Sequence, residues 1–298
     1  MNLPLVETAP TVPLSHLDEL WFQVAGTRCN LACHHCFISC SPTNHEFGFL
    51  SAETIERALA DSVAIGVKEY YFTGGEPFLH PDMITILERT LRLGPATVLT
   101  NGTLFTDHGL ARLRQAEETS RYSLEFRVSL DGFTPETNDP VRGHGTFERI
   151  LRGVGQLLAY DFLPVLTVAQ TSDDAGGLFE GFVSLLTSIG YSRPRVKILP
   201  TLRLGAEVDR QRGYHPDERV TPEMLDGYDV GQLLCEHARI VTDRGIVVCP
   251  ILIEALDMLL GPALADAHRP AVLRHAACFT CYQHGALCAN ASGVRRNA

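Results

Sequence analysis

Apolar runs and amphipathic stretches alternate along the first two thirds of the chain. Short runs rich in β-branched and aromatic residues predict strands at 21–27, 69–73, 96–100, 124–130, 164–169 and 195–199. Apolar positions spaced three or four residues apart predict helices at 51–65, 81–93, 107–117, 146–159 and 178–189. This alternation builds parallel strands joined by right-handed crossovers, in either an open doubly wound sheet or a partial barrel.

Polar motifs follow the first four predicted strands. A cysteine-rich run follows the first, Thr73-Gly74-Gly75-Glu76-Pro77 closes the second, Thr100-Asn101-Gly102-Thr103 closes the third and Ser129-Leu130-Asp131-Gly132 closes the fourth. Any one of these motifs alone is also typical of an ordinary turn. Because carboxyl ends of parallel strands share one edge, all four together predict a functional site there.

The pattern changes near residue 200. A polar, glycine-containing segment at 203–218 predicts a linker or a substrate-facing loop, and the residues beyond it hold five of the nine cysteines. We therefore expect an N-terminal extension at 1–17, a core at 18–200 and a small cysteine-rich extension at 201–298.

Composition narrows the class of protein. With 45% hydrophobic and 20% charged residues, the 298-residue chain is typical of a globular protein, and its net charge of -10 argues against nucleic-acid binding. Residues 1–15 lack the basic and apolar regions of a secretory signal, and prolines and acidic residues interrupt the most apolar stretch, 245–264. We expect a cytoplasmic chain without a membrane span, in which thiols are metal ligands or core residues.

The motif Cys29-x3-Cys33-x2-Cys36 places three thiolates within reach of one metal centre. A closed structural site needs four donors, so three cysteines indicate a [4Fe-4S] cluster with one iron open to an external ligand. A packed thiol cluster or a zinc ion is the alternative, and zinc needs a fourth donor from Cys40, His34 or His35. We expect both histidines to be solvated and Cys40 to be a core thiol, with zinc ligation or hydrogen donation to a substrate as its other roles.

Three motifs together, in this order, resemble the radical S-adenosylmethionine (radical SAM) superfamily over roughly residues 18 to 200. They are the cysteine triplet with the aromatic Phe37 behind it, Gly74-Gly75-Glu76-Pro77, and Ser129-x-Asp131. The resemblance implies an α/β fold, a partial (β/α)6 TIM-like barrel with a [4Fe-4S] cluster at its top. The open iron would bind the amino and carboxylate groups of SAM, whose reductive cleavage yields a 5'-deoxyadenosyl radical that abstracts hydrogen from a substrate.

The resemblance also implies contacts with SAM. The two glycines would let the backbone approach the methionine amino group, and Ser129 and Asp131 would accept hydrogen bonds from the ribose hydroxyls. Phe37 packs either near the adenine or in the core. Arg142 either pairs with the SAM carboxylate or is a solvated arginine in a helix-start turn capped by Thr146. The implied SAM contacts are Phe37, Gly74, Gly75, Glu76, Pro77, Asn101, Ser129, Asp131 and Arg142.

The C-terminal cysteines resemble the auxiliary-cluster extension called SPASM, or its shorter form, twitch. The spacings Cys235-x9-Gly245-x3-Cys249 and Cys278-x2-Cys281-x6-Cys288 depart from that pattern by single residues, and there are too few cysteines for two clusters. One auxiliary [4Fe-4S] cluster is implied, with Cys235, Cys249, Cys278 and Cys281 as ligands and Cys288 as substitute or bystander. A zinc site built by the same four residues is the alternative.

The implied function is a radical SAM oxidoreductase-like enzyme acting on a small molecule or peptide by oxidation, crosslinking or rearrangement. Few residues precede the first predicted strand, so we expect no leader-binding module, and a peptide substrate would be delivered by a separate partner. A flavodoxin- or ferredoxin-like protein would donate electrons, and neither nucleic acid nor membrane is expected as a partner. The alternatives are a maturase of a ribosomal precursor peptide and a zinc-stabilised binding protein without catalysis.

Overall fold

One nine-stranded sheet organises the computed structural model, which describes residues 9–170 and 175–285. Its strand order is β10-β9-β8-β2-β3-β4-β5-β6-β7. The strands are β2 (Glu19–Gln23), β3 (Glu69–Thr73), β4 (Ala96–Thr100), β5 (Leu124–Ser129), β6 (Val165–Gln170), β7 (Arg195–Pro200), β8 (Ala238–Thr242), β9 (Gly245–Val247) and β10 (Leu259–Gly261).

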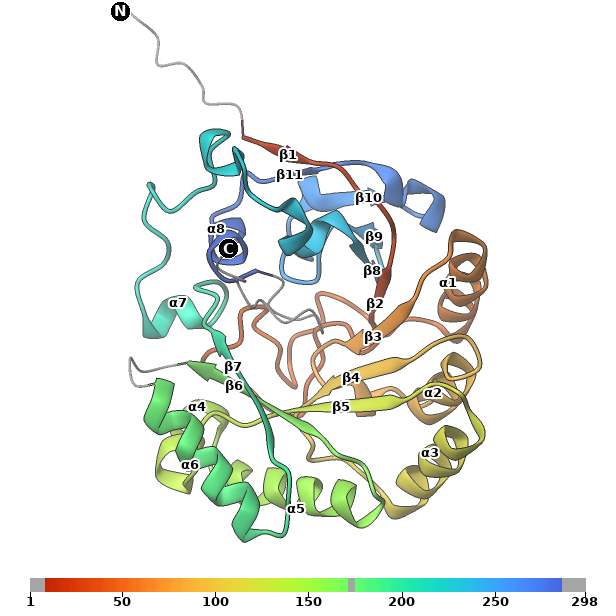
Figure 1. Ribbon diagram of the computed structural model, residues 1–298, viewed down its shortest axis with the longest axis vertical. Coiled ribbons are helices and arrows are strands. Elements are labelled where there is room, and N and C mark those ends of the chain that lie inside the picture. The colour runs from red at the N-terminus through yellow and green to blue at the C-terminus, as the bar shows by residue number, and fades with distance from the viewer. Residues whose placement is uncertain (1–8, 171–174, 286–298) are drawn as a thin grey trace, which may run out of the picture.

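Strands β2 to β7 lie side by side in chain order, and each pair is parallel. A doubly wound sheet would reverse its strand order partway, so this order selects the partial barrel. The ladder ends at β7 and β10, which are not paired with each other in the described chain, so the barrel is open. Figure 1 shows the strands curving around a central space with helices outside them. The predicted α/β partial barrel is confirmed.

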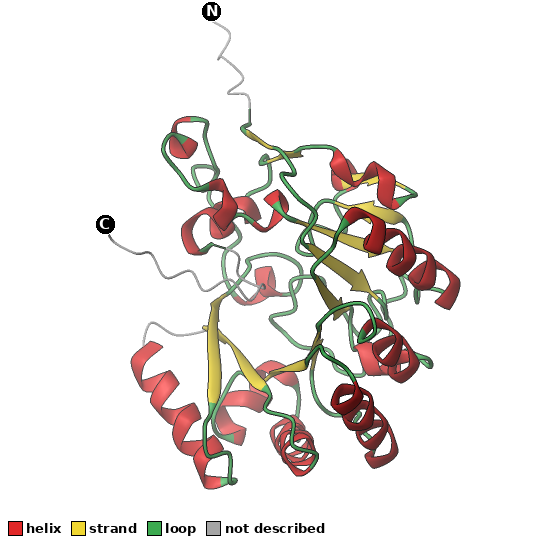
Figure 2. Cartoon of the chain, turned by 45° about the vertical axis from the view of Figure 1, so that its right-hand side comes forward, coloured by secondary structure: helices red, strands yellow, loops and turns green. Residues whose placement is uncertain are grey.

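Five helices on the outside of the curved sheet each lie in the connection between two consecutive strands: α1 (Ala52–Ile65), α2 (Met83–Thr90), α3 (Asp107–Thr119), α5 (Thr146–Ala159) and α6 (Ala175–Ser188). Figure 2 shows these helices as an outer layer. The shorter helices are α4 (Pro135–Arg142), α7 (Glu207–Arg210) and α8 (Ala277–His284), with 3-10 turns η1 (Pro77–Leu79), η2 (Glu223–Leu225), η3 (Val230–Gln232), η4 (Leu234–Glu236), η5 (Leu256–Met258) and η6 (Leu264–His268). None of the helices in the described ranges has the length and apolar character needed to cross a bilayer.

Helix α1 shows how the sequence sets these elements. The Ser51 side chain accepts a hydrogen bond from the Thr54 amide and caps the first turn, while Gly66 ends the helix in the left-handed region at φ 91°. Between the caps, Ile55 and Leu59 are buried at the spacing of one helix face. The predicted helix at 51–65 includes the cap residue Ser51, so it begins one residue before the observed helix.

The two faces of the sheet differ in chemistry. Trp21 stacks on Tyr71 with ring centroids 4.3 Å apart, and Trp21 lines the central cavity, so this pair lies on the inner face. Phe22 and Phe72, the next residues, stack at 5.2 Å on the opposite face beneath the helices, because side chains alternate along a strand. Apolar packing therefore fills the outer layer and leaves the inner face for a site.

The C-terminal region adds strands β8, β9 and β10 to the same sheet. None of these three strands was predicted from the sequence. Strand β8 pairs parallel with β2, and β9 and β10 continue the sheet antiparallel. A second, two-stranded sheet joins β1 (Thr11–Val12) to β11 (Ala271–Val272). Apolar runs on both sides of Asp243-Arg244-Gly245 were the available hairpin signal. Both cysteine-rich regions are thus attached to one ladder of hydrogen bonds.

Candidate functional site

The loop between β2 and α1, residues 24–50, carries the cysteine triplet and is called here the cysteine loop. The loop after β3 packs against its backbone, because the Gly75 amide donates to the Gly26 carbonyl at 2.9 Å and the Glu76 amide donates to the Arg28 carbonyl at 3.0 Å. A Cβ atom on Gly75 would lie 2.0 Å from the Arg28 carbonyl oxygen. Glycine at this position is therefore required for the two loops to meet.

The Glu76 side chain is fully buried and turned toward β4. Its carboxylate accepts hydrogen bonds from the Phe78 amide at 3.1 Å, the Thr100 hydroxyl at 2.7 Å and the Asn101 amide at 2.7 Å. Burial raises the pKa of Glu76 to about 7, against the opposing effect of these three donors. This carboxylate fixes the ends of β3 and β4 relative to each other.

A cavity of about 250 Å³ lies at the carboxyl ends of the strands, inside the barrel. Cys29, Cys33 and Cys36 all line it. The Asn101 side chain reaches from the end of β4 to the cysteine loop, where its Nδ2 lies 2.8 Å from Asn30 Oδ1 and 3.7 Å from Cys29 Sγ. Other lining residues on strands or in the loops after them include Thr73, Gly74, Gly75, Leu99, Arg127, Ser129, Asp131, Thr167, Lys197 and Leu199.

The three thiols of the triplet have different environments. Burial raises the pKa of Cys29 to about 12 and also raises that of Cys33. A hydrogen bond from the Cys40 thiol, assisted by the Cys40 amide at 3.2 Å from the sulfur, lowers the pKa of Cys36 to about 6. Cys40 is buried, as expected for a core thiol, and also lines the cavity.

In residues 9–170 and 175–285, no group of three or more His, Cys, Asp or Glu side chains is placed to hold a single metal ion. The triplet instead surrounds a cavity. Of the donors that a zinc site would need, His34 is exposed, and the other two, His35 and Cys40, interact with Asp131 and Cys36, respectively. Thiolates spread around a cavity suit a cluster with several irons, because each thiolate binds its own iron.

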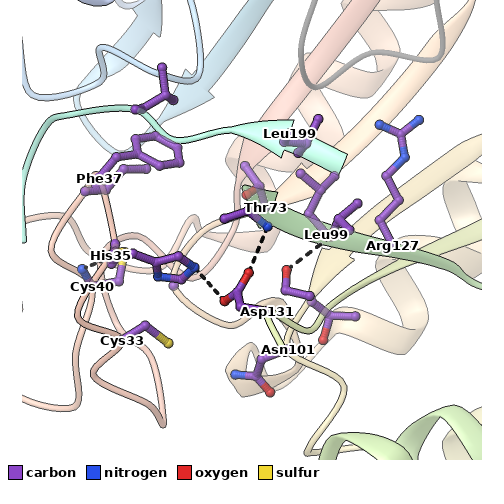
Figure 3. Close-up of a pocket in the computed structure, with 18 of the residues that line it drawn as sticks. Cys33, His35, Phe37, Cys40, Thr73, Leu99, Asn101, Arg127, Asp131 and Leu199 are labelled. Atoms are coloured by element: carbon purple, nitrogen blue, oxygen red, sulfur yellow. Dashed lines mark hydrogen bonds and ion pairs between the residues drawn. The ribbon is translucent and has the colours of Figure 1, made fainter. Parts of the chain in front are cut away.

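Asp131 links the cysteine loop to the strand edge. Its Oδ2 lies 2.7 Å from His35 Nε2 and 2.6 Å from Arg142 Nε, while Oδ1 accepts a hydrogen bond from the Ala169 amide at 2.9 Å. Figure 3 shows His35 and Asp131 pointing toward each other across the cavity wall. Burial opposes ionisation of Asp131, but the Arg142 guanidinium and the His35 imidazole outweigh it and lower the pKa of the carboxyl.

The position of Arg142 excludes one of its two expected roles. Arg142 is the last residue of α4, is 6% exposed, and has its Nη1 4.0 Å from Cys33 Sγ. The cap of the next helix is Gly145, and Thr146 is the first helical residue. A solvated arginine in a turn capped by Thr146 is therefore wrong, because the ion pair with Asp131 holds the guanidinium inside the protein.

A second, apolar cavity contains the C-terminal cysteines. Cys235 lies in η4, Cys249 follows β9, and Cys278 and Cys281 stand one turn apart on α8. All four line this cavity together with Leu, Ile, Val, Ala and Met side chains. None of the eight described cysteines forms a disulfide with another described cysteine. Cys288 lies outside the described residues.

The two cavities share a wall. Ile251 lines both of them, and Pro250, next to Cys249, lines the barrel cavity. The C-terminal cysteines therefore lie directly behind one side of the central cavity.

Comparison with known proteins adds the family. The model of the "Radical SAM superfamily" matches residues 24–170, which include the cysteine loop and strands β3 to β6. Residues 24–170 belong to the radical SAM superfamily.

The curated relatives are longer than this chain. An AdoMet-dependent heme synthase of Methanosarcina barkeri is 37% identical over 144 residues, which are 48% of this chain and 39% of the relative. The mycofactocin maturase MftC of Mycobacterium ulcerans is 30% identical over 182 residues, 60% of this chain and 47% of the maturase. The chain spans less than half the length of these two relatives.

Solved structures share the radical SAM fold. Streptococcus suis SuiB bound to S-adenosylmethionine gives a TM-score of 0.61 at 15% identity, covering 81% of this chain and 62% of SuiB. The protein anSMEcpe with bound AdoMet and Cp18Cys peptide gives 0.60 at 17% identity, covering 84% of this chain and 79% of anSMEcpe. At these identities the likeness supports the fold.

The radical SAM core brings most of the predicted SAM contacts to the barrel cavity. Those lining it are Phe37, Gly74, Gly75, Asn101, Ser129, Asp131 and Arg142. Glu76 and Pro77 do not line the cavity: both are buried, the former among its three donors and the latter at the start of η1. Direct contact of any of the nine residues with SAM stays a prediction.

Sequence reasoning missed His35. We expected a solvated side chain, but it is 12% exposed and paired with Asp131. The available signal was the acidic residue Asp131 after another predicted strand, because the loops at one sheet edge meet. Trp21 and Thr167 were also missed, although strand alternation places both of them on the inner face.

The residues present fit the cofactors that the radical SAM family implies. Three thiols border one cavity, and Nδ1 of His35 is buried there without a hydrogen-bond partner among the described residues. Buried polar atoms normally have a partner, so this nitrogen indicates room for a polar group in the cavity.

Proposed function

We propose that this chain is a radical SAM enzyme that cleaves S-adenosylmethionine reductively and abstracts a hydrogen atom from its substrate. The observation that carries the proposal is the meeting of Cys29, Cys33 and Cys36 at one cavity with the polar ends of β3, β4 and β5. The three thiolates would hold a [4Fe-4S] cluster, and the strand ends would hold SAM. When bound, the reduced cluster supplies the electron that splits a carbon-sulfur bond of SAM into methionine and an adenosyl radical.

The chain's own contribution is placement and shielding. Asn101, Ser129 and Arg142 present amide, hydroxyl and guanidinium groups to the cavity, and Trp21, Leu99 and Leu199 present apolar surface. Polar groups at one end fix the orientation of a ligand, and apolar walls exclude water and competing hydrogen donors from the reacting atoms.

The cavity behind Ile251 is proposed to hold one auxiliary [4Fe-4S] cluster on Cys235, Cys249, Cys278 and Cys281. Four thiols in an apolar pocket make a closed donor set, which suits an electron-transfer or structural site. Since the two cavities share a wall, this cluster would accept the electron that remains after hydrogen abstraction. A flavodoxin- or ferredoxin-like protein is proposed as the donor to the first cluster.

The proposed substrate is a small molecule or a peptide brought by a separate partner. Maturation of a ribosomal precursor peptide is a second candidate, supported by the similarity to mycofactocin maturase over 60% of this chain.

The decisive experiment is anaerobic purification followed by iron and zinc analysis and incubation with SAM and a strong reductant. We expect about eight irons per chain, four in each cluster, and release of 5'-deoxyadenosine. A colourless protein that contains zinc and leaves SAM intact would instead support a zinc-stabilised binding protein.

A further inference from the structure

Arg239, on β8, is a fully buried arginine held by backbone carbonyls alone. Its Nε donates to Ala267 O at 2.8 Å, Nη1 donates to Cys235 O at 2.6 Å and to Ala238 O at 2.7 Å, and Nη2 donates to Arg269 O at 2.8 Å. These bonds use four of the five N–H donors of the guanidinium. They do not neutralise its charge.

No carboxylate within the described ranges forms an ion pair with Arg239. Burying a charge without a counter-charge is costly by several kcal/mol, and buried cations are therefore normally paired. The buried Arg127 illustrates the usual solution, since its Nε lies 3.0 Å from Glu125 Oε1. Arg239 thus needs an anion of another kind.

The nearby groups able to become anionic are cysteines of the second cavity. The Arg239 guanidinium donates to the Cys235 carbonyl oxygen at 2.6 Å, and the Cys235 side chain lines the second cavity together with Cys249. Metal binding removes thiol protons outright, and four thiolates give a centre with net negative charge.

Arg239 is also fixed with respect to that centre. The guanidinium binds the carbonyl oxygen of Cys235 itself, and it joins η4 to Ala267 in η6 and to Arg269 directly after η6. A buried, immobile cation in low dielectric acts on a neighbouring centre much more strongly than a solvated one.

We propose that Arg239 is the counter-charge of the auxiliary metal centre and that it raises the reduction potential of that centre. The inference rests on the proposed auxiliary cluster at Cys235, Cys249, Cys278 and Cys281. Reduction adds negative charge to the cluster, so a fixed cation beside it favours the reduced state.

The test uses the full chain with Cys29, Cys33 and Cys36 replaced by alanine, so that only the auxiliary cluster is present. Its midpoint potential is measured by a redox titration followed by electron paramagnetic resonance, with and without Arg239→Gln. We expect the equilibrium constant for reduction to fall about tenfold in the variant, which is about 59 mV more negative for a one-electron couple. Arg112→Gln is the control, because Arg112 is paired with Glu88 on the outer helices and lines neither cysteine cavity.

Arg239→Lys separates charge from hydrogen bonding and serves if Arg239→Gln does not fold. Lysine keeps the positive charge but cannot reproduce the four-carbonyl arrangement, so a potential close to that of the parent is expected. An unchanged potential in Arg239→Gln, or an equally lowered one in Arg239→Lys, would overturn the proposal. Absence of iron from the triple-alanine parent would refute the auxiliary cluster itself, which is a separate failure.

Discussion

Nε2 of His35 in the cysteine loop lies 2.7 Å from Oδ2 of Asp131 beyond β5, and the same oxygen lies 2.6 Å from Nε of Arg142. One buried carboxylate therefore contacts an imidazole and a guanidinium that come from different parts of the chain. Through His35 it fixes the segment between Cys33 and Cys36. The shape of the proposed cluster site depends on this contact.

Asp131→Asn should destabilise the fold. Asparagine retains an oxygen for the Ala169 amide but leaves Arg142 buried without its counter-charge, which is expected to lower the free energy of unfolding by about 3–5 kcal/mol at pH 7. Because the pKa of Asp131 is lowered in the fold, this contribution is present above its ordinary pKa of 3.8 and is lost as the pH falls further. Urea unfolding at several pH values measures both effects.

The control for this variant is Asp226→Asn, at an exposed position, which should change stability by less than about 0.5 kcal/mol. Equal losses in the two variants would show that the His35–Asp131–Arg142 contact contributes nothing specific.

Glu76→Gln should weaken the junction of β3 and β4. The carboxylate accepts three hydrogen bonds, and the amide nitrogen of glutamine would face one of the three donors instead. That donor would lose its hydrogen bond, and an unsatisfied buried donor costs about 1–3 kcal/mol. Since burial raises the pKa of Glu76 to about 7, the wild type should lose stability as the pH rises from 4.5 through 7, and the variant should not. The difference in unfolding free energy should thus narrow with rising pH. A constant difference would contradict the raised pKa.

Gly75→Ala should separate the cysteine loop from the loop after β3. The added Cβ would lie 2.0 Å from the Arg28 carbonyl oxygen, so the backbone must move. We expect a lower melting temperature and less iron bound after reconstitution. Gly155→Ala is the matched control, because its Cβ meets nothing within 4 Å on α5, where alanine should stabilise by roughly 0.5–1 kcal/mol. Normal iron binding by Gly75→Ala would show that the iron site does not need the close approach of the cysteine loop and the loop after β3.

Cys33→Ala and Cys281→Ala should separate the two proposed centres. Cys33 lines the barrel cavity and Cys281 the cavity behind it. The first variant should lose SAM cleavage altogether, whereas the second should still release 5'-deoxyadenosine but fail to complete turnover. Each is measured by product chromatography alongside iron content. Loss of SAM cleavage in Cys281→Ala with its first cluster intact would contradict this division of roles.

Local patterns predicted the barrel core well. The strands at 69–73 and 96–100 and the helix at 146–159 have the predicted bounds, because propensity and periodicity agree there. The first strand ends at Gln23 rather than at residue 27. The Gln23 side chain donates a hydrogen bond to the Gly26 carbonyl at 2.9 Å, within the turn that follows the strand. Helix α4 was missed because it is short and contains Pro140.

The remaining features depend on contacts between distant parts of the chain. Strand β8 acquires its place by pairing with β2, and a run of five residues does not indicate its partner. Likewise, nothing near His35 in the sequence reveals that Asp131 will lie beside it. The cysteine spacings could be read directly, but the shared wall at Ile251 required the folded arrangement.

The pairing of β2 with β8 also orders events during biosynthesis. Strand β2 leaves the ribosome well before β8, so the edge of β2 that pairs with β8 stays unpaired until β8 has been synthesised. Translation adds about 5–20 residues per second, so the nascent barrel keeps an exposed edge for many seconds. Cofactor insertion into the proposed site at Cys29, Cys33 and Cys36 would therefore take place either on an unfinished scaffold or after β8 has joined the sheet, when the proposed second site is being formed as well.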